Sequence, residues 1–414
     1  MELVSPAGNA EKLQYAWEYG ADAAYIGLKN FSLRVKADNF HGREHEYITR
    51  IKADYAAAGK PKKLFCALNI TFHNDDIAKF LSEADYFRNY PFDAFIIQDM
   101  GMVRILQKEF PSVPLHLSTQ ANCVNSKAAK MYLDMGFKRI VLGREAGLAE
   151  IAEIKQAVPE MELECFVHGA MCIAYSGRCL MSAYLTGRSA NKGFCSHTCR
   201  WDWQLLSGEK ETVVEERERP GEFFPVVEED GYTSLFSSKD LCMIDHLTEM
   251  KKAGVDALKI EGRMKSLYYT AVVTRAYRKK LDALEGLIPE TEAAPYADDL
   301  ENVAHREFSS GFYFDKNNAN KTTRGKSSSP YLLAGIIGKE FPGKGYEFIA
   351  MNKIDRGMRL EYIGPDLCAE ADTAYILIDP DTGAELDWVS HGHPCIIRTE
   401  KPVRERFIVR CLKE

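Results

Sequence analysis

The sequence predicts an α/β protein whose first two thirds fold as a (β/α)8 TIM-like barrel. Short apolar segments alternate with amphipathic segments as far as residue 265, and a glycine often separates a helical segment from the next apolar one. Strict alternation of this kind is typical of parallel strands joined by crossover helices. An open doubly wound sheet is the alternative, but no G-x-G-x-x-G follows the first apolar segment.

Eight segments have the length and apolar character of buried strands, and helical periodicity lies between them. The expected strands are residues 2–4, 23–27, 64–69, 94–98, 115–119, 139–143, 163–168 and 257–261. The clearest helical patterns are residues 11–19, 44–58, 77–87, 102–110, 126–135 and 266–284. These segments supply the eight strands that a closed barrel needs.

The division into domains follows from two interruptions of this pattern. Residues 169–243 separate the seventh expected strand from its helix, so we expect a large βα insertion over the mouth of the barrel. The chain then divides into a barrel at 1–290, an extension and linker at 291–330, and a small all-β barrel at 331–414. The last part has period-two alternation with glycine and Asp-Pro turns. Its linker is polar and basic, with Lys316, Lys321, Arg324 and Lys326.

Composition indicates an ordinary globular protein, with 46% hydrophobic and 27% charged residues. The N-terminus has no signal-peptide pattern and no apolar run is long enough to span a bilayer, so we expect a cytoplasmic protein with no membrane partner. The formal net charge is −7, yet nine acidic and three basic residues between 209 and 230 account for most of it. Charge therefore neither favours nor excludes RNA.

Five cysteines within residues 164–203 predict a metal centre. They are Cys165, Cys172, Cys179, Cys195 and Cys199. Clustered thiols in a reducing compartment favour zinc or iron–sulfur over disulfides, and the C-x6-C spacing of Cys172 and Cys179 is wider than in structural zinc sites. Buried packing is the alternative for any single cysteine, above all for Cys165.

A fourth ligand is expected from Cys242, just before the barrel resumes. Four cysteines from one insertion would form a closed site of the kind that holds a 4Fe–4S cluster. The expected ligands are Cys172, Cys179, Cys195 and Cys242, with Cys199 competing with Cys195 for one position.

Alternation along the seventh strand places Glu164 and His168 on one face, which we expect to be the barrel interior. In the eighth strand Lys259, Glu261 and Arg263 share a face in the same way. We expect Glu164, His168 and Glu261 to be the catalytic groups. The alternative for Glu164 and His168 is a purely structural role in the core. The alternative for Glu261 is a structural salt bridge with Lys259.

The expected mouth of the barrel is rich in cations, which suits an anionic ligand. Arg34 is a further candidate, because it follows the second strand. Polar residues also close the fourth and fifth strands, where packing alone would favour apolar side chains. The predicted substrate-binding residues are Arg263, Arg178, Lys259, Arg144, Gln120 and Gln98.

The segment ECFVHGAMCIAYSGRCLMS at 164–182 resembles the signature of peptidase family U-32, the collagenase-like family. ELVSPAGNAEKL, GADAAYIGL, LSTQAN, LGREAGLAEI, SSKDLCMIDHL and LKIEGRMKS also resemble family phrases, in the expected order. Despite the family's name, the sequence shows no convincing peptidase machinery. The resemblance implies oxygen-independent hydroxylation by enzymes that carry a 4Fe–4S cluster, with cluster ligands at Cys172, Cys179, Cys195 and Cys242.

Branches of that family differ in substrate. Chain length and the terminal β domain most resemble the branch that makes 5-hydroxyuridine at the tRNA wobble position, with prephenate as oxygen donor. The implied partners are a tRNA anticodon loop, prephenate and a homologous partner subunit. The alternatives are hydroxylation of a 23S rRNA cytidine or of a ubiquinone precursor, and a peptidase acting on collagen-like peptides.

Overall fold

A computed structural model describes residues 1–34, 37–172, 174–200, 212–215, 223–229, 232–234, 238–314 and 328–413. The linker lysines and arginine expected at 316–326 and much of the acidic stretch at 209–230 lie outside these ranges. Contacts divide the chain into two compact units. The first comprises Met1–Trp17, Ala21–Lys265 and Arg306–Lys326, and the second comprises Glu18–Gly20, Ser266–His305 and Ser327–Glu414.

The first unit is a closed barrel of eight parallel strands, which confirms the predicted TIM-like fold. Neighbouring strands pair in chain order, and the last strand pairs with both β1 and β7. β2 is buried along its whole length, as strands covered on both faces are. The strands are β1 (Glu2–Pro6), β2 (Ala23–Ile26), β3 (Lys63–Leu68), β4 (Ala94–Ile97), β5 (Leu115–Leu117), β6 (Phe137–Val141), β7 (Glu162–Ala170) and β12 (Ala257–Ile260).

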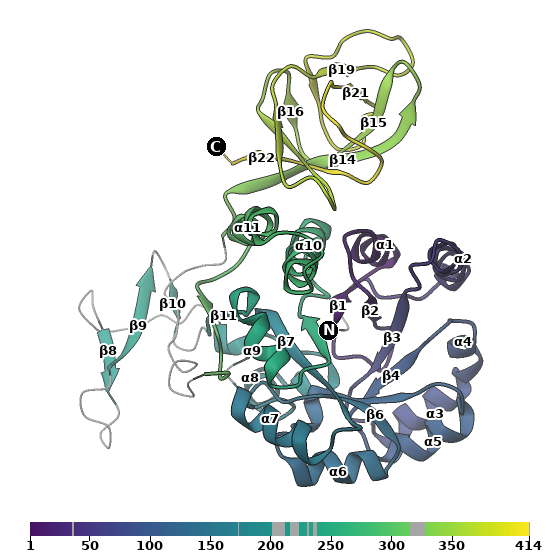
Figure 1. Ribbon diagram of the computed structural model, residues 1–414, viewed down its shortest axis with the longest axis vertical. Coiled ribbons are helices and arrows are strands. Elements are labelled where there is room, and N and C mark those ends of the chain that lie inside the picture. Colours follow the sequence, from purple (N-terminus) through teal and green to yellow (C-terminus); the bar gives the residue numbers. More distant parts are fainter. Residues whose placement is uncertain are drawn as a thin grey trace. The chain divides into compact units, whose positions relative to one another are not determined.

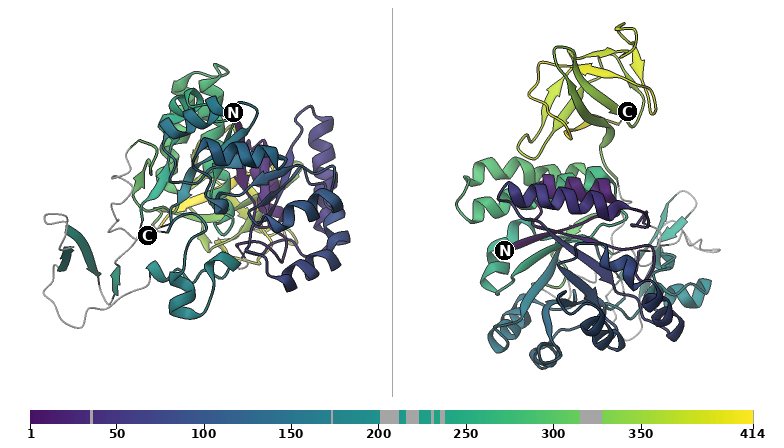
Figure 2. Two further views of the ribbon diagram at one scale, coloured as in Figure 1. Left: turned by 90° about the horizontal axis from the view of Figure 1, so that it is seen from below. Right: turned by 90° about the vertical axis from the view of Figure 1, so that its right-hand side faces the viewer.

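Helices connect these strands and lie outside the ring that they form (Figures 1 and 2). Each presents apolar residues inward, and Asn125 caps the start of α6 by accepting a hydrogen bond from the backbone N–H of Ala128. The helices are α1 (Ala10–Glu18), α2 (Glu44–Ala57), α3 (Asn74–Ser82), α4 (Ala84–Arg88), α5 (Gly101–Glu109), α6 (Ser126–Asp134), α7 (Leu148–Ala157) and α9 (Leu247–Lys252).

The long insertion follows β7 and contains short elements. α8 (Met181–Thr186), η2 (Ala190–Lys192) and η3 (Thr198–Arg200) come first, followed by an antiparallel sheet of β8 (Thr212–Glu215), β9 (Phe223–Glu229) and β10 (Tyr232–Ser234). β11 (Asp240–Cys242) then pairs antiparallel with β7, and β13 (Phe308–Ser309) pairs with β11. The barrel sheet is thereby extended beyond its eight strands at the carboxyl end of β7.

The second unit combines two helices with an antiparallel sheet. The helical part is α10 (Leu267–Leu284), α11 (Glu290–Asp298) and η5 (Asp299–Asn302). The seven sheet strands are β14 (Tyr331–Phe341), β15 (Gly345–Ala350), β17 (Leu360–Ile363), β18 (Glu370–Asp372), β19 (Ile376–Ile378), β21 (Ile396–Arg398) and β22 (Ile408–Leu412). The strands β16 (Ile354–Asp355) and β20 (Trp388–Val389) form a separate pair.

The all-β character predicted for the C-terminal part is confirmed, in the form of a half-barrel. Within the described residues the edge strands β18 and β19 are not paired with each other, so the sheet stays open. Register shifts in β14 bend it, and Phe348, Tyr362 and Ile397 fill its core.

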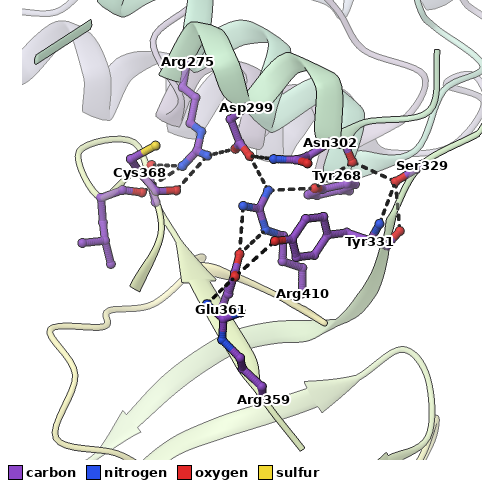
Figure 3. A network of polar contacts seen from close by, with 12 residues as sticks. Tyr268, Arg275, Asp299, Asn302, Ser329, Tyr331, Arg359, Glu361, Cys368 and Arg410 are labelled. Atoms are coloured by element: carbon purple, nitrogen blue, oxygen red, sulfur yellow. Dashed lines mark hydrogen bonds and ion pairs between the residues drawn. The ribbon is translucent and has the colours of Figure 1, made fainter. Parts of the chain in front are cut away.

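A buried ionic network links the helices of the second unit to its sheet (Figure 3). Arg410 of β22 donates to Asp299 at 2.5 Å and to Glu361 at 3.0 Å. Arg275 of α10 also pairs with Asp299, and it donates to the backbone oxygens of Gly364 and Leu367. Buried charges need such partners because desolvation is costly. Among the described residues, no helix is long and apolar enough to cross a membrane.

Candidate active site

A pocket of about 510 Å³, its open mouth included, lies at the carboxyl ends of the barrel strands. This is the end of the barrel where TIM-barrel enzymes build their active sites. Its lining combines apolar residues of the strands with charged or polar residues, most of which follow the strands. The lining residues are Tyr25, Leu33, Arg34, Ala67, Asn69, Ile96, Ser118, Thr119, Gln120, Val141, Arg144, Phe166, Lys259, Glu261 and Arg263.

Arg263 is the most informative residue of this pocket. It is 2% exposed, and its Nη1 has no hydrogen-bond partner among the described residues. Burial, followed by repulsion from Arg34, lowers the pKa of Arg263 to about 10, so the side chain still carries its charge at neutral pH. A buried guanidinium nitrogen without a partner is costly. An anion in the pocket would satisfy it.

Glu261 is the acidic residue among the lining side chains, and two arginines hold it. Arg34 Nη2 lies 3.1 Å from one carboxylate oxygen and Arg144 Nη2 lies 3.6 Å from the other. Burial would raise the pKa of Glu261, but Arg34 and Arg144 outweigh it and the pKa is lowered. Arg144 also stacks on Phe166, with its Cζ 3.9 Å from the ring centroid. Glu261 is therefore an anionic group that positions two arginines at the rim.

Lys259 joins the pocket to a second cluster beneath it. Its Nζ donates to Glu164 at 2.5 Å, and Arg139 donates to the other carboxylate oxygen at 3.0 Å. Glu164 is fully buried and is not one of the residues that line the pocket. Burial would raise its pKa, yet Lys259 and Arg139 keep the pKa below the ordinary value. Glu164 therefore acts on the pocket through Lys259.

His168 points away from the lining residues because β7 is irregular at this position. Lys259 pairs with Phe166, but the next residue, Ile260, pairs with His168, so Val167 is an extra residue. A bulge of this kind reverses the alternation of side chains. His168 is buried, and its ring lies 5.4 Å from that of Phe308. Within the described structure, Glu164 and Phe166 thus share a face that His168 does not.

The remaining predicted binding residues divide between the pocket and its surroundings. Arg144 and Gln120 line the pocket. Gln98 lies outside the lining set and donates to Thr71 Oγ1 at 3.2 Å. Arg178 is exposed on the insertion, where its backbone N–H bonds to Tyr175. Tyr25 also lines the pocket, with its ring 4.2 Å from Lys259 Nζ, but the sequence analysis does not predict this role. The alternation of side chains between the two faces of the strand at residues 23–27 is the signal that could have identified it.

The insertion that carries the cysteines is attached to the barrel mouth. The backbone N–H of Ser176 donates to Glu145 at 2.8 Å, and that of Thr71 donates to Asn191 at 3.1 Å. Gly177 approaches Gln120 so closely that a Cβ would lie 2.1 Å from the Gln120 carbonyl oxygen. The anchoring residues 71, 120 and 145 all follow barrel strands. The insertion therefore borders the pocket.

All the predicted cluster ligands are at least partly exposed: Cys172, Cys179, Cys195, Cys199 and Cys242. By contrast, Cys165 is buried, as expected for a packing residue. In the part of the chain that is described, no group of three or more His, Cys, Asp or Glu side chains could hold a metal ion. As placed, the thiols do not fit a metal site, and the ligand set stays a prediction.

Comparison with known proteins identifies the family. The model of "Peptidase family U32" matches residues 8–323. "tRNA hydroxylation protein P" of Helicobacter pylori strain J99 is 41% identical over 423 residues, covering 97% of this chain and 96% of that protein. The protein of the same name from Escherichia coli K12 is 38% identical over 342 residues, covering 75% and 74%.

A third relative carries a different name. A 23S rRNA 5-hydroxycytidine synthase of Escherichia coli K12 is 36% identical over 284 residues, covering 69% of this chain and 40% of that protein. The family match spans most of the chain and includes seven of the eight barrel strands, the residues that line the pocket and the insertion. The chain therefore belongs to peptidase family U32.

Proposed function

We propose that the chain is an RNA-modifying enzyme that hydroxylates the wobble uridine of tRNA at carbon 5, with prephenate as the oxygen donor bound in the barrel pocket. The observation that carries this proposal is the buried, unpartnered Nη1 of Arg263. The names of the relatives, which refer to tRNA and rRNA hydroxylation, support the reaction class. The proposed location is the cytoplasm, where tRNA is found.

The charge of the pocket favours a dianion. Four cations line it: Arg34, Arg144, Lys259 and Arg263. Glu164 neutralises Lys259, and Glu261 neutralises one of its two arginines. Two positive charges are then left unbalanced among these residues. Prephenate has two carboxylates, and arginine is well suited to bind carboxylates in a bidentate manner.

In this pocket, the side chains of the chain itself bind and orient the donor. Arg263 would bind one carboxylate from the inner part of the pocket, where low exposure strengthens the interaction. Arg34 or Arg144, both held by Glu261, would bind the other at the rim. The target uridine has to be unstacked to reach the barrel mouth, which an anticodon loop allows.

A 4Fe–4S cluster bound by Cys172, Cys179, Cys242 and either Cys195 or Cys199 is also part of the proposal. The number and spacing of the thiols support it, and so does their place in an insertion that borders the pocket. Such a cluster would supply electron transfer or hold the insertion together.

The test is an anaerobic assay of the full chain with unmodified tRNA, with and without prephenate, followed by mass analysis of the nucleosides. We expect 5-hydroxyuridine only with prephenate. Arg263→Met should abolish it, and Arg263→Lys should retain little activity because one ammonium cannot replace a bidentate fork. Arg43→Met is the matched control, since Arg43 is exposed and pairs with Glu46. Product formed equally without prephenate, or full activity of Arg263→Met, would contradict the proposal.

A further inference from the structure

The insertion at 171–200 exposes an unusual number of large apolar side chains. Tyr184 is 84% exposed, Leu180 72%, Tyr175 65% and Phe194 48%. Exposed aromatic rings that gather in one short segment generally mark a binding surface. Three of these four residues carry an aromatic ring.

The same segment is basic in a chain that is acidic as a whole. Residues 171–200 contain four Arg or Lys and no Asp or Glu, whereas the whole chain has a net charge of −7. Arg178 and Arg188 are exposed, and Lys192 pairs with Asp76 at 3.3 Å. Aromatic rings combined with an excess of positive charge are the usual elements of surfaces that bind single-stranded nucleic acid.

Local hydrogen bonds hold the exposed rings on one folded segment. Ser182 Oγ donates to the Arg188 carbonyl at 2.7 Å and accepts from the Ser196 backbone N–H at 3.0 Å. The Phe194 backbone N–H bonds to the Ser189 carbonyl, and the Asn191 side chain bonds to the Cys179 carbonyl. The rings of Tyr184 and Phe194 are therefore presented by a framework that ties α8 to the residues on either side of η2. Tyr175 precedes this framework, and its carbonyl accepts a hydrogen bond from the Arg178 backbone N–H.

This framework stands beside the pocket. Gly177 lies against Gln120, which lines the pocket. The Ser176 backbone N–H donates to Glu145, the residue next to Arg144 in the sequence, and Arg144 also lines the pocket. A polynucleotide lying on the segment would reach the barrel mouth with its bases unstacked. Bases that stack on aromatic side chains in this way are held without being paired.

We propose that Tyr175, Tyr184 and Phe194 form a stacking surface for unpaired bases of the RNA substrate, with Arg178 and Arg188 contacting its phosphates. The inference rests on the proposed RNA-modifying function and names the surface that receives the RNA. The pocket binds the small anion, and the insertion binds the loop that flanks the target base. The lack of acidic residues in the segment favours RNA over an apolar protein partner.

The experiment measures binding of fluorescently labelled tRNA to the full chain by anisotropy. Single substitutions Tyr175→Ala, Tyr184→Ala and Phe194→Ala should each weaken binding by about five-fold or more, since a stacked base contributes substantially to affinity. Met131→Ala is the control, because Met131 is 51% exposed but lies on α6. Arg178→Ala and Arg188→Ala should each lower the slope of log affinity against log salt by about 0.7.

Two further variants separate stacking from apolar docking. Tyr184→Trp keeps an aromatic face and should retain affinity, whereas Tyr184→Leu keeps apolar area without a ring and should lose it. If Tyr184→Leu keeps wild-type affinity for tRNA, or if all the Ala variants do, the proposal of a stacking surface is wrong. The proposed hydroxylation of tRNA by the wild-type chain would not be affected by that result. Wild-type protein that fails to bind tRNA would overturn both this inference and the proposed function. Binding of prephenate serves as the folding control for every variant.

Discussion

A Cβ atom added to Gly27 would lie 2.0 Å from Nη1 of Arg263, so the guanidinium occupies space that only a glycine leaves free. Arg263 follows β12, and Gly27 follows β2 directly. The close approach explains how so large a cation is accommodated within the barrel mouth. It also provides a way to displace Arg263 without changing its charge.

Gly27→Ala should lower the affinity for prephenate about ten-fold or more, because the guanidinium must move away from its position. Titration calorimetry of the full chain measures this. Gly101→Ala is the control, since a Cβ there meets only Asp99 Oδ1 at 3.1 Å. Unchanged affinity in Gly27→Ala would show that Arg263 does not bind the anion from this position.

Glu164→Gln should destabilise the barrel by about 3–5 kcal/mol, because it removes the carboxylate that neutralises the buried Lys259, whereas Arg139 keeps its pairs with Glu2 and Glu162. Chemical denaturation followed by tryptophan fluorescence measures the change. Glu46→Gln, at the exposed pair with Arg43, should change stability by less than about 1 kcal/mol. Equal effects of the two substitutions would contradict the structural role of Glu164.

Acid should destabilise the barrel because Glu164 and Glu261 become protonated. The pKa of each is lowered in the folded chain relative to 4.5. Such groups contribute stability above the unfolded pKa, and that contribution is lost as pH falls through the folded pKa. Stability should therefore decline below about pH 4.5, and less steeply in Glu164→Gln. Denaturation midpoints of the wild type and of Glu164→Gln at a series of pH values test this. The same pH dependence in both proteins would contradict the prediction.

Asp299→Asn should destabilise the second unit by about 3–5 kcal/mol, because Arg275 and Arg410 both depend on that carboxylate. Hydrogen exchange of β17 and β22 should then accelerate. Asp366→Asn is the matched control, since it loses only an exposed pair with Arg404. Exchange that is unchanged in Asp299→Asn would mean that the network adds nothing to the stability of this unit.

Anaerobically purified protein should contain about four irons per chain and absorb near 400 nm. Substitution of Cys172, Cys179 or Cys242 by Ala should lower the iron content sharply, and comparison of Cys195→Ala with Cys199→Ala decides between those two thiols. Cys368→Ala is the control, because Cys368 is part-exposed but belongs to the second unit. Iron-free protein after anaerobic reconstitution would rule out the cluster.

The sequence alone predicted the barrel and part of its pocket because strand alternation governs both. Lys259, Glu261 and Arg263 alternate along one short segment, and all three line the pocket. His168 was expected beside Glu164, but the bulge at Val167 depends on how β7 pairs with β12, which a single strand does not reveal. Glu164 can be fully buried because Arg139 from the neighbouring strand β6 pairs with it. The alternation of residues along a single strand shows which side chains face inward but not how deeply they are buried.

The cysteines illustrate a different limit. Their number and spacing indicate a soft-metal site, but which thiols meet depends on the fold of a long insertion with little regular structure. The exposure of the rings of Tyr175, Tyr184 and Phe194 likewise cannot be predicted from the sequence. Aromatic residues are usually buried, so only their exposure distinguishes a binding surface from a core.

The ionic network of the second unit bears on how such proteins can evolve. Arg275 and Asp299 precede His305, whereas Glu361 and Arg410 follow Ser327, so the network combines two separate stretches of the chain. A gene crossover between those stretches would transfer the sheet without its helical partners and leave buried charges unmatched on both sides. The charges of the half-barrel are thus matched by residues 266–305, which supply Arg275 and Asp299.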